Sequence, residues 1–585
     1  MSKQITIYIN DKEIVANEGQ TILQAAQEQG IYIPRLCFLK DIHEEGNCRI
    51  CSVKVDGQKN LKPACRTQIA QGMKIITNDQ DVYDYVSMNL ELLAKRHHFE
   101  CFKCSREDNC EFLDLLRRYS IDNEFSRMYG FNPEDYYFSD SSGVIVFDSS
   151  KCILCGRCVS ACEKQSGLGI IHFNERGSHT YVGPAQFHPI EDSGCIYCGK
   201  CIQACPTGAI REKDDIKNVE RALRDKSKKV VVQVAPSVRA ALGEPFGLPI
   251  GTNVEGQMFT ALKLMGFDEI IDTNFTADLT IMEEGTEFIS RLNGQGKLPL
   301  FTSCSPGWIN LLELYYPEFI ENVSSCKSPQ QMAGALIKTY YAEKMNVKPE
   351  DIVSVSIMPC IAKKAEARRD DMGRDGYKDV DFVLTTREFS RLIKRHDLDL
   401  KNLESSNPYG MLASYTGAGA IFGATGGVME AALRTVSEIL EEKPTPIDFT
   451  EVRGNKDIKE ATIKIKGQDI KIAVVHGGIA IKAFLDKLKT THETYHFVEF
   501  MGCTGGCING GGQPIVPARI IEKVDVRALR AAVLYDIDSS HTIRKSHENP
   551  FIQQLYKDFL GKPNSHKAHE LLHTSYQKRE PYHDI

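Results

Sequence analysis

Alternating apolar and polar residues at the amino terminus predict a small β-rich domain. Residues 5–9 alternate isoleucine with polar side chains, and residues 12–16 resume the alternation after the polar pair Asn10-Asp11. Residues 20–29 then place Ile22, Leu23 and Ala26 at helical spacing. We therefore expect a hairpin followed by a short amphipathic helix.

A different pattern begins near residue 213, where short apolar runs alternate with amphipathic segments. We expect helices at 217–226, 328–344 and 386–394, in addition to an earlier one at 83–95. The expected strands cover 229–234, 269–272, 298–302, 352–358, 380–385, 472–475 and 497–501. This order predicts α/β packing, with helices covering a largely parallel sheet. A hairpin at 461–472, turning at Gly467, is expected to be peripheral, and the tail from His547 to Ile585 to be helical and polar.

Composition places the chain among globular proteins with several domains. It has 585 residues, of which 42% are hydrophobic and 25% charged, and a chain of this length favours about three to five domains. The formal charge of −7 argues against nucleic-acid binding, which needs a basic face. No apolar run approaches the about 18 residues of a spanning helix, and the first residues lack a signal-peptide pattern. We therefore expect a cytoplasmic protein that binds neither membrane nor nucleic acid.

Twenty cysteines are the most informative feature of the composition. They fall into four groups, with four at 37–65, three at 101–110, eight at 152–205 and five at 304–507. In a reducing compartment, clustered cysteines indicate metal binding rather than disulfides.

The first group has intervals of 10, 2 and 13 residues between Cys37, Cys48, Cys51 and Cys65. Plant-type ferredoxins use a four-residue first interval, then two residues, then a distant fourth cysteine. The longer pattern is similar to the [2Fe–2S] domain fused to hydrogenases and to the large electron-transfer subunit of respiratory complex I. A zinc site is the alternative, and the β-grasp-like elements ahead of the cysteines disfavour it.

The second group adds a histidine to three cysteines. His97 precedes Cys101, Cys104 and Cys110. The spacing of histidine and cysteines in similar iron–sulfur domains selects His97 as the ligand rather than its neighbour His98. An imidazole in place of a thiolate makes a [4Fe–4S] cluster less negative, which usually raises its potential. Zinc held by the same four groups is again the alternative.

The third group is the most specific motif. Two runs with C-x2-C-x2-C-x3-C spacing lie 43 residues apart, and the second ends in Cys205-Pro206. This is the bacterial two-cluster pattern, in which the fourth cysteine of each run binds the other cluster. One [4Fe–4S] cluster is thus assigned Cys152, Cys155, Cys158 and Cys205, and the other Cys195, Cys198, Cys201 and Cys162.

Three later segments carry the remaining cysteines. They are 301–308 (FTSCSPGW), 358–366 (MPCIAKKAE) and 500–514, where six glycines surround Cys503 and Cys507. Each follows an apolar run, so we expect the cysteines at the carboxyl ends of strands, where α/β sites are usually built. In this order, the segments resemble the three signature motifs of the [FeFe]-hydrogenases, and the resemblance covers essentially the whole chain.

The resemblance implies four domains and a catalytic H-cluster. We expect a [2Fe–2S] domain at 1–80, a His-ligated [4Fe–4S] domain at 81–125, a two-cluster ferredoxin domain at 126–212 and an α/β catalytic domain at 213–585. The H-cluster is a [4Fe–4S] cube bridged to a two-iron unit that carries CO, cyanide and azadithiolate. By position, Cys360, Cys503 and Cys507 bind the cube, Lys363 binds a cyanide, and the residues lining the diiron unit are Pro236, Ser237, Gln330, Met358 and Met501.

The first signature segment departs from the family pattern. That pattern has adjacent cysteines, the first moving protons and the second binding the cube, whereas this chain has Cys304-Ser305. A serine oxygen suits iron–sulfur chemistry poorly, but an additional thiol, Cys326, lies nearby in sequence. Either Cys304 binds the cube and another group moves protons, or Cys304 moves protons and the fourth ligand lies elsewhere.

The resemblance also implies a proton relay from the surface to the active-site thiol, with Glu284, Glu287, Arg291 and Ser324 as its members. A buried glutamate has a raised pKa and can pass protons near neutral pH. Without the resemblance, Glu283, Glu284 and Glu287 would be interpreted as an exposed helix face.

These features predict an enzyme that reversibly reduces protons to H₂. Four accessory clusters would carry electrons from ferredoxin or from a flavin-containing NAD(P)H-oxidising subunit, and separate maturation proteins would load the diiron unit. The alternatives are a redox- or H₂-sensing or iron–sulfur scaffold member of the same superfamily, and a complex I-like electron-transfer subunit. The latter would lack the three segments after residue 300.

Overall fold

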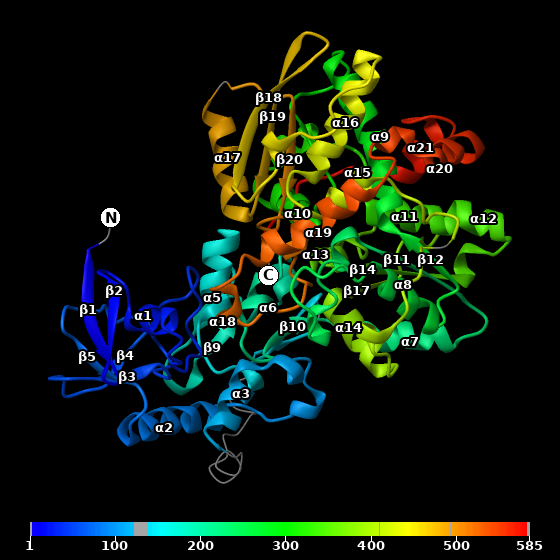
Figure 1. Ribbon diagram of the computed structural model, residues 1–585. Helices are drawn as coiled ribbons and strands as arrows, with labels where there is room; N and C mark the ends of the chain where they lie inside the picture. The colour runs from blue at the N-terminus through cyan, green and yellow to red at the C-terminus, as the bar shows by residue number, and fades with distance from the viewer. Residues whose placement is uncertain (1–2, 122–137, 142, 409, 492, 582–585) are drawn as a thin grey trace. The chain divides into compact units, whose positions relative to one another are not determined.

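The computed structural model describes residues 3–121, 138–141, 143–408, 410–491 and 493–581 (Figure 1). They form two compact units. Unit 1 comprises 1–193, 200–211 and 515–523, and unit 2 comprises 194–199, 212–514 and 524–585. The domain boundary predicted at residues 125 and 126 lies outside the described residues.

Unit 1 begins with the predicted hairpin and helix. Strands β1 (Gln4–Ile9) and β2 (Lys12–Asn17) pair in antiparallel register, and Asn10 and Asp11 take positive φ angles of 49° and 61° in the tight turn between them. Helix α1 (Ile22–Glu28) begins with a capping box at Thr21. The sheet order is β2-β1-β5-β3-β4, with the further strands β3 (Ser52–Val55), β4 (Lys62–Pro63) and β5 (Lys74–Ile76).

Short elements make up the rest of unit 1 and hold the cysteine loops. The helices are α2 (Gln80–Arg96), α3 (Glu111–Arg118), α5 (Arg157–Ala161), α6 (Lys200–Ala204) and α18 (Ala518–Ile521). The strands are β6 (Ser139–Asp140), β7 (Ile145–Asp148), β8 (His172–Asn174) and β9 (Tyr181–Gly183), while β10 (Ile210–Glu212) ends at the unit boundary.

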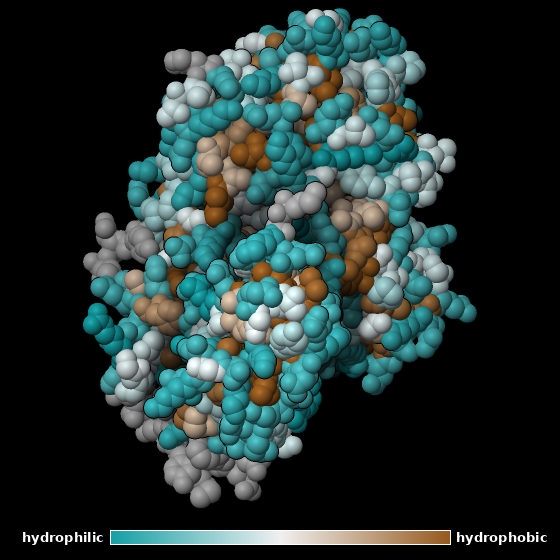
Figure 2. Space-filling model, turned by 60° about the vertical axis from the view of Figure 1, so that its left-hand side comes forward, coloured by the Kyte–Doolittle hydropathy of each residue, from teal (hydrophilic) through white to brown (hydrophobic). Residues whose placement is uncertain are grey.

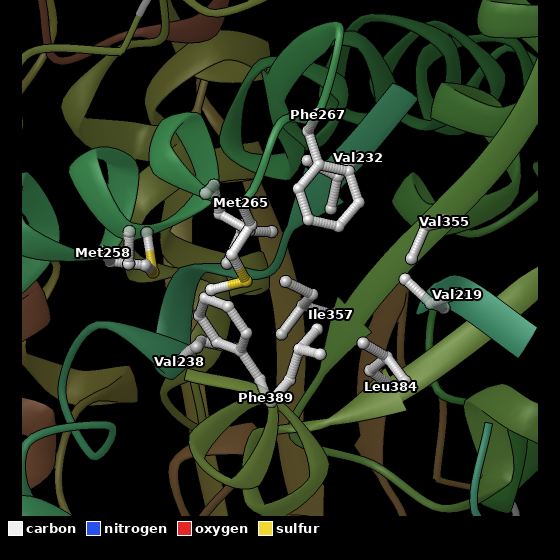
Figure 3. Close-up of a cluster of buried hydrophobic side chains, with 14 of the residues drawn as sticks. Val219, Val232, Val238, Met258, Met265, Phe267, Val355, Ile357, Leu384 and Phe389 are labelled. Atoms are coloured by element: carbon white, nitrogen blue, oxygen red, sulfur yellow. The ribbon is translucent and has the colours of Figure 1, made fainter. Parts of the chain in front are cut away.

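The first sheet of unit 2 is fully parallel, as predicted. Its order is β12-β11-β14-β17, with bounds β11 (Lys229–Val234), β12 (Glu269–Asp272), β14 (Ile352–Met358) and β17 (Phe382–Thr385). Val230, Val232 and Val234 pack with α7 (Ile216–Arg224), α8 (Glu255–Leu264) and α14 (Thr386–Arg395). Figure 3 shows this cluster, in which Val232, Val355 and Ile357 lie among Phe267, Met265 and Phe389.

The opposite face of the same sheet is also covered. Val231 packs with α9 (Thr273–Leu292), α11 (Pro329–Leu336) and residues of the tail. Helix α11 continues through a π-helical turn, Ile337–Tyr341, into α12 (Ala342–Met345). Because both faces are buried, even the polar residues Gln233, Ser354 and Ser356 within these strands are buried.

A second sheet has the order β13-β20-β19-β18. Its strands are β13 (Leu300–Phe301), β18 (Ile458–Ile465), β19 (Gln468–His476) and β20 (Phe497–Met501). The expectation that the 461–472 hairpin is peripheral is wrong for β19, which lies inside the sheet with residues 472–476 buried. Of the two hairpin strands, only β18 lies at an edge of the sheet, and its alternating exposure explains the polar pattern.

Helix α9 packs against both sheets. Phe275 and Leu279 pack in the cluster that contains Val231 of the first sheet. Ala277, Ile281 and Phe288 pack in the cluster of the second sheet, together with α16 (Gly427–Glu441). The other side of the second sheet carries α10 (Pro306–Tyr315) and α17 (Gly478–Thr490), with Trp308 and Phe484 against Phe500. A helix buried on most of its circumference is expected to be apolar all round, so its buried glutamates need a separate explanation.

The tail is less polar than predicted. Helices α20 (Pro550–Leu555) and α21 (His566–Leu572) bury Leu555 and Leu572, although residues 574–581 are not helical. Helix α19 (Val526–Ser540) precedes the tail and buries Leu534. The apolar residues sit at helical spacing within a charged sequence, which hides the buried face. The remaining elements of unit 2 are α13 (Ala362–Glu366), α15 (Gly417–Ala420), β15 (Gly373–Arg374) and β16 (Tyr377–Lys378).

Polar side chains dominate the face shown in Figure 2, where hydrophobic side chains form small separate groups. In the described part of the chain, no helix combines the length and hydropathy needed to cross a membrane.

Candidate active site and accessory cluster sites

A cavity in unit 2 collects the chemistry of the three signature segments. Strands β13, β14 and β20 end just before Cys304, Cys360 and Cys503, as predicted from the apolar runs. Since β14 belongs to one sheet and β13 and β20 to the other, the segments converge from two sheets. The cavity, together with the open solvent space at its mouth, has a volume of about 530 Å³. Its lining includes Cys304, Cys360, Cys507, Lys363, Pro236, Gln330, Met358 and Met501.

Cys360, Cys503 and Cys507 form one electrostatically coupled thiol group. A side-chain hydrogen bond with Cys503, followed by burial, raises the pKa of the Cys360 thiol. Burial raises the pKa of Cys507 to about 12, and Cys503 adds to this rise. Three partly buried thiols coupled in this way cannot all ionise without a cation between them. This donor set therefore fits a metal centre.

Glycines allow the third segment to approach its neighbours closely. A Cβ on Gly510 would lie 2.3 Å from the Pro359 carbonyl oxygen, beside Cys360. A Cβ on Gly511 would lie 2.4 Å from the carbonyl oxygen of Cys198. Side chains at these positions would push the loops apart.

The Cys304 thiol lines the same cavity, but its strongest electrostatic coupling is to the Glu284 carboxyl group. Burial raises the pKa of its thiol; Glu284 adds to the rise, whereas Lys363 opposes it. Ser305, the N-cap of α10, points its Oγ to the third segment and accepts a hydrogen bond from the Gly502 amide at 3.0 Å. The serine thus lies directly beside Cys503, whereas Cys304 lies between the cavity and Glu284.

Cys326 does not line this cavity. It is fully buried in the core formed by α9, α11 and the tail, together with Met332 and Phe275. Burial raises the pKa of its thiol, and the charges of Glu287, Glu284 and Glu283 add to the rise. The structure therefore gives no support to Cys326 as a fourth thiol for the cavity group.

The Lys363 side chain is paired with Glu366, the last residue of the same signature segment. Its Nζ lies 3.0 Å from Glu366 Oε2 and 3.1 Å from the Cys304 carbonyl oxygen. Gln330 Nε2 donates to the same Glu366 oxygen at 2.9 Å. Ser237 is buried but does not line the cavity; its carbonyl oxygen accepts a bond from Gln513 Nε2. The role of Glu366 escaped the sequence reasoning, although its Lys-x2-Glu spacing on a helix was a usable signal.

The structure places the four relay residues in unit 2, on α9 and on the segment before α11. Arg291 pairs with Glu287, and Ser324 Oγ donates to Glu287 Oε2 at 2.8 Å. Glu284 accepts from the Ser303 amide and lies 1% exposed on α9. Interpreting these acids as an exposed helix face is wrong, because α9 is enclosed by both sheets and the tail.

Glu284 has the pKa of a proton carrier. Burial raises it to about 8, the charge of Glu287 adds to the rise, and bonds from Ser303 and Ser324 oppose it. A carboxyl group that titrates near neutral pH can both accept and release a proton under working conditions.

The predicted crossover between the two ferredoxin-like runs has a structural counterpart in unit 1. Cys152, Cys155, Cys158 and Cys205 line one cavity with about 410 Å³ of empty space. Burial raises the pKa of Cys152, Cys155 and Cys158. Of the partner set, Cys162 and Cys201 lie in unit 1 and Cys195 and Cys198 in unit 2, so that set stays a prediction.

The amino-terminal cysteines also meet. Cys37 Sγ accepts from the Cys48 amide at 3.5 Å, Cys48 Sγ accepts from the Cys37 amide at 3.4 Å, and Cys51 hydrogen-bonds with Cys65. A hydrogen bond from Cys48 lowers the pKa of Cys37 to about 6. Four thiols within one loop region suit a binuclear cluster.

His97 is oriented as a metal ligand. Its Nδ1–H donates to the Lys151 carbonyl oxygen at 3.0 Å, which leaves Nε2 available. Burial lowers the pKa of His97 to about 4, so the imidazole is neutral as ligation requires. His98 instead is half exposed beside Glu100. Cys104 influences the titration of both Cys101 and Cys110, which places the three thiols near one another.

Known proteins share this arrangement of domains. Residues 228–511 match the family described as "Iron only hydrogenase large subunit, C-terminal domain", and residues 524–579 match "Iron hydrogenase small subunit". Residues 2–80 match a 2Fe-2S iron-sulfur cluster binding domain and residues 151–209 a 4Fe-4S dicluster domain. Iron hydrogenase 1 of Clostridium pasteurianum is 43% identical over 575 residues, covering 98% of this chain and 100% of the relative. The chain belongs to the [FeFe]-hydrogenase family.

Two further [FeFe]-hydrogenase relatives extend the comparison. The NADP-reducing hydrogenase subunit HndD of Solidesulfovibrio fructosivorans is 42% identical, covering 98% of this chain and 99% of the relative. A solved structure of an [FeFe]-hydrogenase HydA1 variant from Chlamydomonas reinhardtii covers 63% of this chain and all of its own, with 39% identity and a TM-score of 0.57. The chain is thus an enzyme of the iron-hydrogenase type, with [2Fe–2S], [4Fe–4S] and H-cluster sites.

Proposed function

We propose that this chain reversibly reduces protons to H₂ at an H-cluster held in the unit 2 cavity. One observation carries the proposal: the cavity brings Cys304, Cys360 and Cys507 together with the buried Lys363, and the Cys304 thiol is electrostatically coupled to Glu284. When bound, the H-cluster supplies the redox-active iron at which protons and electrons combine.

Three thiols and one lysine would hold the cluster. Cys360, Cys503 and Cys507 are proposed as ligands of the cube, with Cys507 also bridging to the diiron unit. The Lys363 ammonium, fixed by Glu366, offers positive charge and hydrogen-bond donors to an anionic ligand. The fourth position of the cube falls near Ser305, whose Oγ bonds to the amide next to Cys503. Pro236, Gln330, Met358 and Met501 would exclude water from the diiron unit.

Cys304 is proposed as the group that moves protons to and from the cavity. Its thiol lies in the cavity lining and is coupled to Glu284. Glu284 would pass the proton by way of Ser324 to Glu287 and Arg291. Of the two arrangements open at this segment, the geometry favours the one in which Cys304 carries protons.

Electrons would enter through the accessory clusters. The proposed ligands are Cys37, Cys48, Cys51 and Cys65 for a [2Fe–2S] cluster, His97, Cys101, Cys104 and Cys110 for a [4Fe–4S] cluster, and the two crossed sets of four for the ferredoxin-like pair. Gly511 packs closely on the Cys198 carbonyl. This contact supports a last electron-transfer step from the cluster at Cys198 to the cube. Ferredoxin or an NAD(P)H-oxidising subunit is the proposed donor, in the cytoplasm, with maturation proteins supplying the diiron unit.

The test is H₂ evolution from reduced viologen before and after anaerobic addition of a synthetic azadithiolate diiron complex. We expect activity only after loading. Absence of activity in a loaded chain with intact accessory clusters by EPR would contradict the proposal and favour a sensing or scaffold role.

A further inference from the structure

His573 forms a hydrogen-bonded bridge beside the proton relay. It follows the last helix, α21, and retains only 8% of its surface exposed. Its Nε2 lies 3.1 Å from Glu283 Oε2, and its Nδ1 lies 2.8 Å from Ser325 Oγ. Both ring nitrogens are therefore engaged, each on a different segment of the chain.

Ser325 connects this histidine to the relay. The Ser325 amide donates to Glu287 Oε2 at 3.1 Å, and Ser325 Oγ lies 3.4 Å from the same oxygen. Ser324 Oγ donates to that oxygen as well, at 2.8 Å. Glu287 Oε2 is thus the point where the path through Ser324 and the path through Ser325 meet.

An exposed histidine lies beside the bridge. The ring of exposed His569, one turn earlier on α21, lies 4.1 Å from that of His573 between centroids. The ionisable groups around His573 are Glu283 and Glu287 on α9, His566 and His569 on α21, Tyr556 and Cys326.

We propose that His573 is a proton-transfer residue that supplies Glu287 through Ser325, as a second arm of the relay. The inference rests on the proposed hydrogenase function. In the imidazolium state, Nε2–H donates to the Glu283 carboxylate and Nδ1–H donates to Ser325 Oγ. The Nδ1 proton then moves to Ser325 Oγ, while the hydroxyl proton moves to Glu287. The products are neutral His573, which accepts from Ser325, and protonated Glu287; the reverse sequence carries protons outward.

Two substitutions separate proton transfer from a purely structural role. His573→Gln keeps a hydrogen-bonding amide but cannot carry a proton, whereas His573→Ala leaves space that free imidazole can fill. His547→Ala is the matched control, because His547 is a partly buried histidine of the same unit that bonds to Thr435 and lies outside the relay. Thermal unfolding of each variant without the diiron unit shows whether it folds.

We expect His573→Gln to keep the unfolding midpoint of the parent and to lower viologen-driven turnover about tenfold, since general acid–base groups contribute ~10²–10⁴ and the Arg291 arm stays open. Ser325→Ala should lower turnover similarly, and the double variant should be no slower, because both act in one path. Millimolar imidazole should restore turnover in His573→Ala, increasingly as pH falls and imidazole becomes protonated. It should not restore turnover in Ser325→Ala.

Unchanged turnover in folded His573→Gln, or additive losses in the double variant, would overturn the inference and leave the hydrogenase function intact. A loss in His573→Ala that imidazole does not relieve would also overturn it, in favour of a structural histidine. No turnover in the loaded parent chain would instead contradict the proposed function, and the inference would fall with it.

Discussion

Replacing Glu284 with glutamine should lower activity and raise stability together. Burial is the main reason that the pKa of Glu284 rises from 4.5 to about 8. Between these values the unfolded chain carries an ionised glutamate while the folded chain holds a neutral one, so the folded protein loses stability as pH rises from about 4.5 to 8. At about 1.4 kcal/mol per pKa unit, the loss reaches about 3 kcal/mol at pH 7 and about 5 kcal/mol above pH 8.

Glutamine has nearly the same shape and does not ionise, so Glu284→Gln removes this cost. The thermal midpoints of variant and parent should coincide near pH 4.5 and diverge by several degrees toward pH 8, with the variant higher. Turnover should fall by about 10²-fold or more, since glutamine cannot pass a proton. Both are measured on the same preparations, unfolding without the diiron unit and turnover after loading. A constant difference in midpoint across this pH range, or retained turnover, would refute the buried-relay account. Glu321→Gln, on an exposed side chain of the same unit, is the control.

Three further predictions concern ligands and loop packing. His97→Ala should lose the EPR signal and the iron of one [4Fe–4S] cluster, whereas His98→Ala should keep that signal and that iron. Equal losses in the two variants would contradict the assignment of His97 Nε2 as the ligand. Gly511→Ala should slow viologen-driven turnover several-fold with little effect on cube content, because its Cβ would lie 2.4 Å from the Cys198 carbonyl oxygen; an unchanged rate would mean that this contact does not set electron transfer. Ser305→Cys should increase retention of the cube under chelation if the serine occupies the fourth ligand position, and unchanged retention would place that ligand elsewhere.

The local elements and the ligand motifs were largely predictable from sequence. Strands β11, β12, β14 and β20 have the predicted bounds, because short segments rich in valine, isoleucine and phenylalanine mark them in the sequence. The spacing of the cysteines likewise indicated which thiols lie close together. Cys205, for example, lines one cavity with Cys152, Cys155 and Cys158.

Long-range packing was not predictable. The sequence places Glu283 and Glu284 in a polar helix segment, and only the second sheet and the tail around α9 make that segment interior. The same applies to His573, which lies about 290 positions from Glu283 in the chain, and to β19, whose central place depends on pairing with β20. The separation of Cys326 from the cavity depends on the direction of one side chain, which a count of thiols cannot give.

Isotope exchange between D₂ and water tests the central claim most directly, because it needs no electron donor and so does not depend on the accessory clusters or on a partner. We predict that mass spectrometry detects HD only after the diiron complex is added. The Cys304→Ala variant should form no HD, although the EPR signal of its cube is unchanged. Absence of HD from a fully loaded chain, or exchange that persists in Cys304→Ala, would contradict it.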